Sequence, residues 1–270
     1  MPTPTSSALT GSAPAAKKKR PPPQLTFVHS VERVTPGVLR VSLEGAGLAS
    51  FAASKPAAHM KLFFPAGDWP PPEGIEAAPR PPSRTYTPRR YDASRGILEI
   101  EFVKHGAGLA ADWAARAKPG DKLWVAAGPG GGYAAPEGMT KLVLLADETA
   151  MPAAGMVIES LGASVAARVY CEIANGAEAR ALSPHVACEP VWLNREPTQA
   201  RPGSMLEAAM AAPGADLADA HFWIACEAGA MRRIRDHLTR WMGIDRARVH
   251  TRGYWRYGDV NYPDHDYGAD

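Results

Sequence analysis

The stretch Lys141-Leu-Val-Leu-Leu-Ala146 decides the architecture of the second half of the chain. It is a continuous apolar run, which is typical of a parallel strand buried on both faces. Strand-like and helical segments alternate after it, and this alternation predicts an open parallel α/β sheet. We expect further strands at 164–172, 185–193 and 221–226, and helices at 151–161, 204–212 and 228–242. The last helix is amphipathic, with one predicted apolar face formed by Met231, Ile234, Leu238 and Trp241.

Upstream of this stretch the sequence has the texture of short strands. Runs rich in branched and aromatic residues, punctuated by Gly and Pro, lie at 25–28, 37–43, 59–64, 97–103 and 121–125. They predict a small antiparallel barrel. The register of 97–103 is ambiguous, because apolar and acidic residues alternate along it. The Pro-rich stretch 69–82 is expected to be a surface loop.

The composition limits the class of protein. With 270 residues, of which 46% are hydrophobic, the chain can form two packed domains. No run approaches the ~18 apolar residues of a membrane helix, so we expect a soluble protein with no stable membrane insertion. The three cysteines form no CxxC pair, which argues against a disulfide scaffold or Cys-rich zinc site and favours a reducing cytoplasm. We expect a tail at 1–24, the barrel at 25–136, the α/β domain at 137–258 and a second tail at 259–270.

The positive charge is concentrated near the N-terminus. The formal net charge is +2, and without the four cations Lys17 to Arg20 the rest of the chain carries 2 − 4 = −2. This near-neutral body does not support a nucleic-acid footprint. We interpret residues 1–24 as a solvated, disordered arm, with contact to an anion or a nucleic acid as the alternative.

The segment Ser83-Arg-Thr-Tyr-Thr-Pro-Arg89 carries most of the chemistry. Arg, Tyr and Thr at alternating positions of an extended strand offer a cation for a phosphate, a ring for stacking and a hydroxyl for a heteroatom. Those are the groups that a flavin dinucleotide needs. From the residues alone, an exposed β-edge with a half-buried tyrosine is an equally good interpretation.

This segment resembles the Arg-x-Tyr-Ser/Thr flavin motif of the ferredoxin-reductase-like superfamily. More specifically, the chain is similar to siderophore-interacting proteins, a family of FAD-dependent ferric-siderophore reductases. Four further segments carry the resemblance in order along 25–258: Val103–Ala114, Pro119-Gly-Asp121 with Gly128-Pro-Gly-Gly131, Ala146–Ala153, and Gly253–Arg256. The resemblance implies a six-stranded FAD-binding barrel followed by an NAD(P)H-binding domain.

The resemblance also implies roles for single residues. Arg84 would contact the FAD phosphate region, Tyr86 would stack on the isoalloxazine, and Thr87 would bond near N5, so that Tyr86 and Thr87 are the expected catalytic residues. The remaining expected cofactor contacts are Thr85, His105, Gly106, Ala110, Ala111, Asp112, Trp113, Asp147, Thr149, Ala150 and Trp255. Physical reasoning agrees for the loop after 103, because a helix N-terminus binds a pyrophosphate without a basic side chain.

Several of these residues have structural alternatives. Asp112 stands in a motif that usually has a serine nearby, and it either points to solvent or caps the helix. Thr149 is also a candidate helix cap. Gly128 to Gly132 lacks the Lys-Ser/Thr of a P-loop and is interpreted as a turn at the domain junction. Tyr254 is expected to pack on the neighbouring domain.

The nicotinamide nucleotide is expected on the α/β domain. Cys226, Glu227 and Ala228 match the turn that faces it in the family, with a buried structural cysteine as the alternative. NADPH and NADH both stay open as donors. The candidates for a 2′-phosphate contact are Arg168, Arg195 and Arg201.

The predicted reaction passes electrons from NAD(P)H through FAD to Fe(III) in a ferric siderophore. Such chelates are often anionic, so we expect a basic pocket that includes one or more of Lys55, Lys61, Arg252 and Arg256. The histidines are scattered without metal-site spacing, so iron is expected to arrive as a chelate. We expect a cytoplasmic monomer. A general flavin or ferredoxin-type reductase and a non-catalytic flavin- or siderophore-binding protein are the alternatives.

Overall fold

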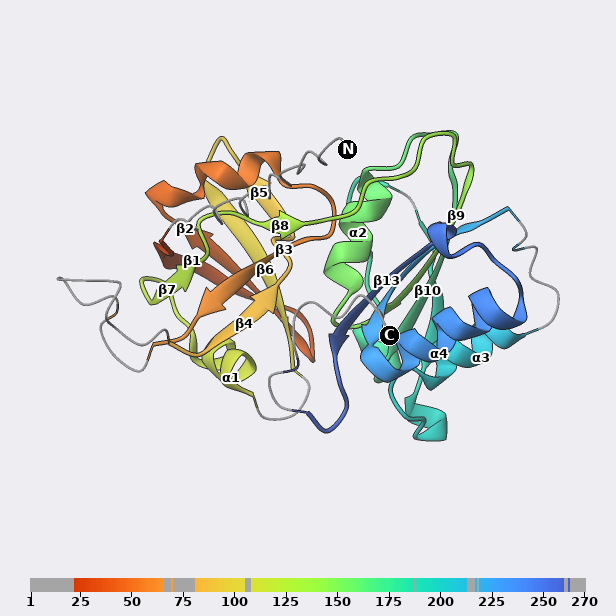
Figure 1. Cartoon of the computed structure of the whole chain (residues 1–270). Coiled ribbons are helices and arrows are strands. Elements are labelled where there is room, and N and C mark those ends of the chain that lie inside the picture. Colours follow the sequence, from red (N-terminus) through yellow and green to blue (C-terminus); the bar gives the residue numbers. More distant parts are fainter. Residues whose placement is uncertain are drawn as a thin grey trace, which may run out of the picture.

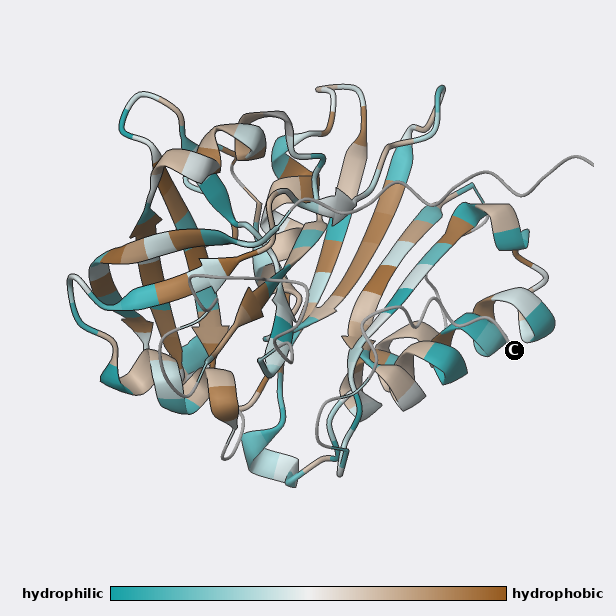
Figure 2. Cartoon of the chain, turned by 60° about the vertical axis from the view of Figure 1, so that its left-hand side comes forward, coloured by the Kyte–Doolittle hydropathy of each residue, from teal (hydrophilic) through white to brown (hydrophobic). Residues whose placement is uncertain are grey.

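The computed structural model describes residues 22–65, 69, 81–104, 108–186, 188–212, 217, 219–259 and 262. Two units lie side by side in Figure 1, an antiparallel barrel and a parallel sheet flanked by helices. Hydrophobic residues, brown in Figure 2, concentrate along the strands of both units, and hydrophilic residues are frequent on the outer helices and loops. No helix in the described part of the chain is long and apolar enough to cross a membrane.

The barrel is built from antiparallel strands whose hydrogen-bonded order is β4-β3-β7-β1-β2-β6-β5, with β8 paired to β3. The strands are β1 (Gln24–Thr35), β2 (Val38–Glu44), β3 (Ala58–Phe63), β4 (Ser83–Tyr86), β5 (Arg90–Asp92), β6 (Ile97–Val103), β7 (Lys122–Val125) and β8 (Gly130–Gly131). A short 3-10 helix, η1 (Ala46–Ala53), packs beside β1, β5 and β6.

One bent segment closes the barrel. Only residues 87–89 separate β4 from β5, and the Arg89 N–H donates to the Glu99 carbonyl at 2.9 Å, which extends the β5–β6 ladder. Pro88 has no N–H to donate to the strand ladder, so the break between β4 and β5 lies at this residue. With β4 and β5 counted as one strand and the two-residue β8 left aside, the barrel has the six strands that the family resemblance implies.

The structure resolves the register of residues 97–103. Leu98, Ile100 and Phe102 point into the barrel and are at most 2% exposed. Glu101 faces the other way and is nevertheless buried, because Arg40 and Arg180 cover it. A long-range ion pair therefore explains the acidic residue within an apolar run.

The second unit is a five-stranded parallel sheet in the order β11-β10-β9-β12-β13. Its elements are β9 (Lys141–Asp147), α2 (Met151–Glu159), β10 (Ala166–Ile173), β11 (Val191–Asn194), α3 (Ser204–Ala211), β12 (His221–Glu227), α4 (Ala228–Asp236) and β13 (Val249–Trp255). In Figure 1, α2 lies between the sheet and the barrel, and α3 and α4 cover the opposite face. The chain builds outward from β9 on one side and then on the other, so the carboxyl end of β9 is the topological switch point where such sheets bind ligands.

Two sequence predictions of secondary structure are wrong in part. The strand expected at 185–193 begins only at Val191, because the preceding residues form a turn in which the Ser183 hydroxyl accepts the N–H groups of His185 and Val186. Pro190 also removes a ladder donor at that point.

The helix expected at 228–242 changes winding. It is α-helical to Asp236 and π-helical over His237–Trp241. A π-turn rotates each residue by less than an α-turn, so the 3.6-residue periodicity ends there. Leu238 stays buried, but Trp241 is 84% exposed, so the prediction that Trp241 shares the buried face is wrong.

The Gly-rich stretch expected as a junction turn contains the two-residue strand β8, which pairs with Ala58 and His59. Gly131 has φ +65°, and a Cβ there would lie 2.5 Å from the His59 ring. Both the backbone conformation and the close approach of β3 therefore require glycine at this position.

Candidate functional site

Residues of the barrel gather around the ring of Phe102. Strand β4 pairs with β3 so that Tyr86 lies opposite Met60. The centroid of the Tyr86 ring lies 4.5 Å from that of the Phe102 ring, and the centroid of the Trp113 ring lies 5.7 Å from it. Burial raises the pKa of Tyr86, although the nearby Arg84 opposes the shift, so the phenol is neutral at physiological pH.

Helix α1 (Leu109–Arg116) brings a row of backbone donors to the same end of the barrel. Its N-cap is Gly108, which makes no side-chain cap, and the first intrahelical bond runs from the Asp112 N–H to the Gly108 carbonyl at 2.8 Å. The N–H groups of the first turn therefore have no intrahelical acceptor and carry partial positive charge. Among the described residues, a Cβ at Gly108 would meet nothing within 4 Å.

The sequence-predicted residues of this helix differ in exposure. Asp112 is exposed, Ala111 and Trp113 are half-buried, and Ala110 is 4% exposed against the barrel core. Ala110 can therefore contribute its backbone rather than its side chain. His105 and Gly106 lie outside the described residues.

The α/β domain contributes a buried carboxyl at the switch point. Asp147, the last residue of β9, is 0% exposed. Its Oδ1 accepts the Thr149 N–H at 3.0 Å and the Thr149 hydroxyl at 2.6 Å, and its Oδ2 accepts the Trp255 indole N–H at 2.7 Å. Burial, with a further contribution from Glu148, raises the pKa of Asp147 to about 7.

These contacts settle one alternative from the sequence. Helix α2 has Ala150 as its N-cap and no side-chain cap, so Thr149 does not cap it. The Thr149 hydroxyl is bonded to Asp147 instead, and Ala150 itself is fully buried.

A hydrogen bond near the ends of β4 and β13 joins the barrel to the α/β domain. The hydroxyl of Thr87 and the phenol of Tyr254 are hydrogen-bonded, and Thr87 is only 7% exposed. Tyr254 also packs against the core of its own domain beside α2. Its bond to Thr87 is the contact with the neighbouring barrel that is expected from the sequence. Tyr254 precedes Trp255, and the flavin-motif segment 84–87 is thereby brought to the carboxyl edge of the sheet.

Three of the four candidate cations lie on or next to β3 and β8. Arg252 is 9% exposed and donates to Nδ1 of His59 at 3.0 Å. Lys61 follows on the same face of β3 as His59, and Lys55 is exposed next to Gly132. A small cavity of about 40 Å³ lies at this junction and is lined by Ala57, Gly131, Gly132, Trp223, His250, Arg252 and Tyr254.

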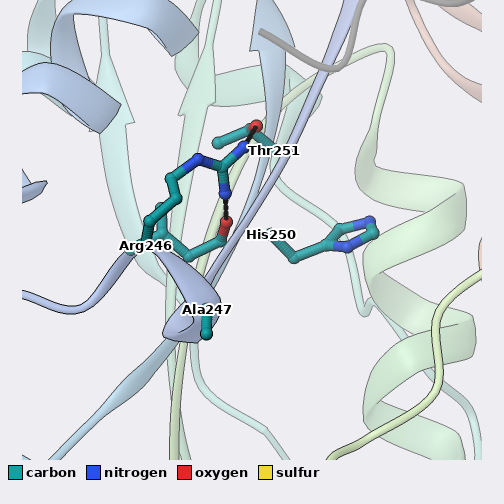
Figure 3. Close-up of a pocket in the computed structure, with 5 residues that line it drawn as sticks. Arg246, Ala247, His250 and Thr251 are labelled. Carbon is teal, nitrogen blue, oxygen red and sulfur yellow. Dashed lines mark hydrogen bonds between the residues drawn. The ribbon is translucent and has the colours of Figure 1, made fainter. Parts of the chain in front are cut away.

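The fourth cation and a larger cavity lie elsewhere. Arg256 is exposed and pairs with Asp259 at 3.7 Å. A cavity of about 400 Å³ opens at the start of β13, the end opposite Trp255. Figure 3 shows that the Arg246 guanidinium there is folded back onto the Val249 carbonyl and the Thr251 hydroxyl. No sequence-predicted site residue lines this cavity.

A network of acids that the sequence did not reveal holds the helix ends of the α/β domain. The Glu172 carboxylate accepts the N–H groups of Gly203, Met205 and Leu206 at 2.6, 3.0 and 3.2 Å, at the start of α3. Glu227 accepts the Ala230 N–H at 2.7 Å and caps α4. In the sequence, the available signal was an acidic residue at the carboxyl end of a buried strand. Only the fold shows which helix N-terminus each carboxylate binds.

The residues predicted near the nicotinamide are interior. Cys226 and Ala228 are 0% exposed and Glu227 is 3% exposed, in keeping with a buried structural cysteine. Burial raises the pKa of the Cys226 thiol well above its usual range.

The candidate 2′-phosphate cations have different partners. Arg195 bonds both Glu148 and Glu172, at 2.8 and 2.9 Å. Arg201 is more exposed and pairs with Glu207 at 2.8 Å. The guanidinium of Arg168 lies 5.3 Å above the Tyr170 ring.

Family models and relatives identify the chain. Residues 27–133 match the model described as the siderophore-interacting FAD-binding domain, and residues 139–258 match the model described as siderophore-interacting protein. The ferric vibriobactin reductase ViuB of Vibrio cholerae is 30% identical over 255 residues, which cover 88% of this chain and 90% of that protein. An NADPH-dependent ferric-chelate reductase of Escherichia coli is 43% identical over 146 residues, 51% of this chain and 56% of that protein.

Solved structures agree with this assignment. A siderophore utilization protein from T. fusca superposes with a TM-score of 0.74 at 35% identity, over 90% of this chain and 96% of that one. A ferredoxin NADP+ reductase from Neisseria gonorrhoeae, at 15% identity and a TM-score of 0.60 over 86% of this chain and 99% of that one, shows the fold alone. The chain therefore belongs to the siderophore-interacting protein family, with an FAD-binding barrel and a ferredoxin-reductase-like α/β domain.

Proposed function

We propose that this protein is an FAD-dependent NAD(P)H oxidoreductase that reduces Fe(III) in a ferric siderophore to Fe(II) and so releases the iron. The observation that carries the proposal is the hydrogen bond between Thr87 of the barrel and Tyr254 of β13. It brings the segment 84–87 to the end of β13, where the next residue, Trp255, bonds Asp147. Relatives named as ferric vibriobactin, ferric acinetobactin and ferric-chelate reductases support the same substrate class.

The donor set at the barrel end fits FAD. A pyrophosphate needs N–H donors and positive charge, which the uncapped start of α1 and Arg84 supply. A flavin ring needs a flat neighbour, and Tyr86 presents an aromatic ring that is itself backed by Phe102.

The residues of the chain would hold and orient the cofactor. Bound FAD supplies the chemistry that converts a two-electron donor into single electrons for iron. Arg84 and α1 would anchor the pyrophosphate, Tyr86 would stack on the ring, and Thr87, already fixed by Tyr254, would lie near N5. The exposed Asp112 would extend into solvent beside the pyrophosphate. Thr85 and Thr149 would contribute further contacts to the cofactor, whereas Ala150 is fully buried and has no surface to offer.

The cations on or next to β3 and β8 would receive the iron chelate. Lys55, Lys61 and Arg252 lie on or beside these strands, and positive charge there would attract an anionic siderophore. Arg256 would act from the rim. Fe(II) is softer than Fe(III) and binds hard oxygen ligands less tightly, so reduction favours release.

NADPH is the donor that we favour. A relative is named as an NADPH-dependent reductase. Arg168 and Arg201 are exposed, although Arg201 also pairs with Glu207, whereas Arg195 is half-buried between Glu148 and Glu172. We further propose that the protein acts as a cytoplasmic monomer without a nucleic-acid partner, with domains at 25–136 and 137–258. The three free cysteines suit a reducing compartment.

An anaerobic titration tests the function. The purified protein, reconstituted with FAD, should show oxidised flavin bands that bleach with NADPH faster than with NADH. Addition of a ferric tris-catecholate should restore the bands while a chromogenic Fe(II) chelator develops colour in step. A flavin that stays oxidised would make this a binding protein, and a reduced flavin that ignores the chelate but reduces ferredoxin would make it a ferredoxin-type reductase.

A further inference from the structure

The carboxyl group of Asp147 bridges two segments that are distant in the sheet. One oxygen holds the turn after β9 through Thr149, and the other holds the indole of Trp255 at the end of β13. Strand β12 lies between β9 and β13, so the bond passes across the end of a strand. It is a tertiary contact and not part of a strand ladder.

An irregular pairing of β13 aims the indole at this carboxyl. Cys226 pairs with Gly253, but Glu227 pairs with Trp255, so Tyr254 is the extra residue of a bulge. A bulge redirects the side chains that follow it. Here it leaves Tyr254 bonded to Thr87 of the barrel and Trp255 bonded to Asp147.

The position of Asp147 is unfavourable for stability alone. The side chain is 0% exposed, and its described hydrogen-bond partners are neutral donors. Among the described residues no guanidinium bonds Asp147, and that of Arg195 bonds the neighbouring acids Glu148 and Glu172. A buried carboxyl without a cation is expensive, and an apolar residue would pack there at less cost.

The geometry requires both oxygens to accept. An asparagine at 147 has one carbonyl oxygen, so its NH₂ group would face either the Thr149 N–H or the Trp255 N–H as donor against donor. Only a carboxyl satisfies the turn and the indole together.

We propose that Asp147 is a positioning residue, which fixes the indole of Trp255 at the domain junction and thereby strengthens FAD binding. The part about FAD rests on the proposed function. The bond between Asp147 and Trp255 does not, and it can be measured in the protein without any cofactor.

The hydrogen bond between Asp147 and Trp255 should depend on pH, because Asp147 can ionise. An ionised carboxylate accepts a stronger hydrogen bond than a neutral one. Burial, Glu148 and Glu172 raise the pKa of Asp147 to about 7, against the opposing bonds from Thr149 and Trp255. The other titratable groups that face it are Cys171 on β10, Cys226 on β12 and Tyr254 on β13. The indole should therefore be held more tightly above pH 7 than below it.

Nitrogen NMR of the indole groups tests the bond directly. In protein labelled with ¹⁵N-tryptophan, the Trp255 N–H resonance is assigned by its loss in Trp255→Phe. We expect this resonance to titrate with a midpoint near pH 7, to shift in Asp147→Asn, and to lose its titration there. Glu148→Gln is the matched control: it removes a neighbouring negative charge but not the bond, so the midpoint should fall. The proposal is overturned if the chemical shift of the Trp255 N–H resonance changes neither with pH nor in Asp147→Asn.

A double-mutant cycle on FAD affinity tests the positioning role. Asp147→Asn and Trp255→Phe should each weaken FAD binding roughly tenfold at pH 8, and the double variant should be no weaker than either. Additive losses would mean that Asp147 does not act through Trp255 and would overturn the proposal. Circular dichroism verifies folding; if Asp147→Asn does not fold, the pH dependence of FAD affinity in wild type, which should disappear in Trp255→Phe, decides instead. An apoprotein that takes up no FAD contradicts the proposed function, whereas the indole titration still judges the bond.

Discussion

The Tyr86 ring is the best-defined single contact on the barrel side of the site. It lies 4.5 Å from Phe102, at an angle of 37°, so its orientation is set before any ligand arrives. A ring that is already fixed loses little conformational entropy on stacking. The phenol oxygen is not needed for this stacking.

Truncation of this ring should weaken flavin binding. Tyr86→Ala removes the stacking surface and should lower FAD affinity about tenfold, whereas Tyr86→Phe keeps the surface and should bind as wild type. Titration of the apoprotein with FAD, followed by flavin fluorescence, measures both. Equal retention of flavin by the alanine variant would contradict the stacking role.

Among the helices of the α/β domain, α3 is capped at its N-terminus by a carboxylate from another element. Glu172, from β10, supplies the acceptor for three of its first N–H groups, and Gly203 as N-cap supplies none. The charge also complements the positive end of the helix dipole. The helix is thereby tied to the sheet at the edge where the nucleotide is expected.

Neutralising Glu172 should therefore destabilise the domain. Glu172→Gln keeps the shape but puts a donor against backbone donors, and we expect a loss of about 2 kcal/mol in the free energy of unfolding. The control is Glu196→Gln, at an exposed acid of the same domain, with a change within about 0.5 kcal/mol. Denaturant unfolding measures both, and equal effects would remove the special role of Glu172.

The π-helical end of α4 separates two residues that look equivalent in sequence. Leu238 is 0% exposed and Trp241 is 84% exposed. Leu238→Ala should cost about 3 kcal/mol, because it leaves a cavity in the core. Trp241→Ser should change the free energy of unfolding by no more than about 0.5 kcal/mol. A large loss for Trp241→Ser would place that ring in the core and contradict the π winding.

At the scale of the whole molecule, the loop after β10 fastens the two domains together. Glu178 accepts from the Thr35 hydroxyl and from the Gly37 N–H, and Arg180 bonds Glu101 at 2.7 Å. Arg89 of the barrel adds a bond to Glu159 of α2, also at 2.7 Å. These contacts hold the segments 84–87 and 254–255 in a fixed relation.

The Glu101–Arg180 pair should make the domain contact sensitive to acid. Burial alone would raise the pKa of Glu101, but Arg180 and Arg40 outweigh it and hold the pKa below its usual value of 4.5. A depressed pKa stabilises the folded state above the ordinary value, and that stability is lost as pH falls through the lower, folded value. Glu101→Gln should cost about 3 kcal/mol at pH 7 and flatten the loss on the acid side.

The matched control for this pair is Glu32, whose side chain is 65% exposed and lies 3.4 Å from Arg40. An exposed pair contributes little, so Glu32→Gln should change the free energy of unfolding by about 0.5 kcal/mol or less. Unfolding curves at pH 7 and at pH 4 measure both variants. A Glu101 variant that keeps the acid sensitivity of wild type would assign that sensitivity to other groups.

The sequence by itself determined the architecture and the segments that carry the site. Periodicity and turn residues separate strands from helices because they reflect local sterics and burial, and they placed the barrel before the parallel sheet. The motif at 83–89 was identifiable as a short run with its own chemistry, and the Asp147 segment was identified by its resemblance to the family.

Only the tertiary structure decided the pairings that give these segments their geometry. Asp147 and Trp255 are 108 residues apart, and no local pattern indicates that a bulge in β13 joins them. The contact of Thr87 with Tyr254, the burial of Glu101 and the exposure of Trp241 likewise depend on neighbours from other elements. Side-chain partners are selected by packing between distant segments, whereas the sequence pattern records only which face of each segment is buried.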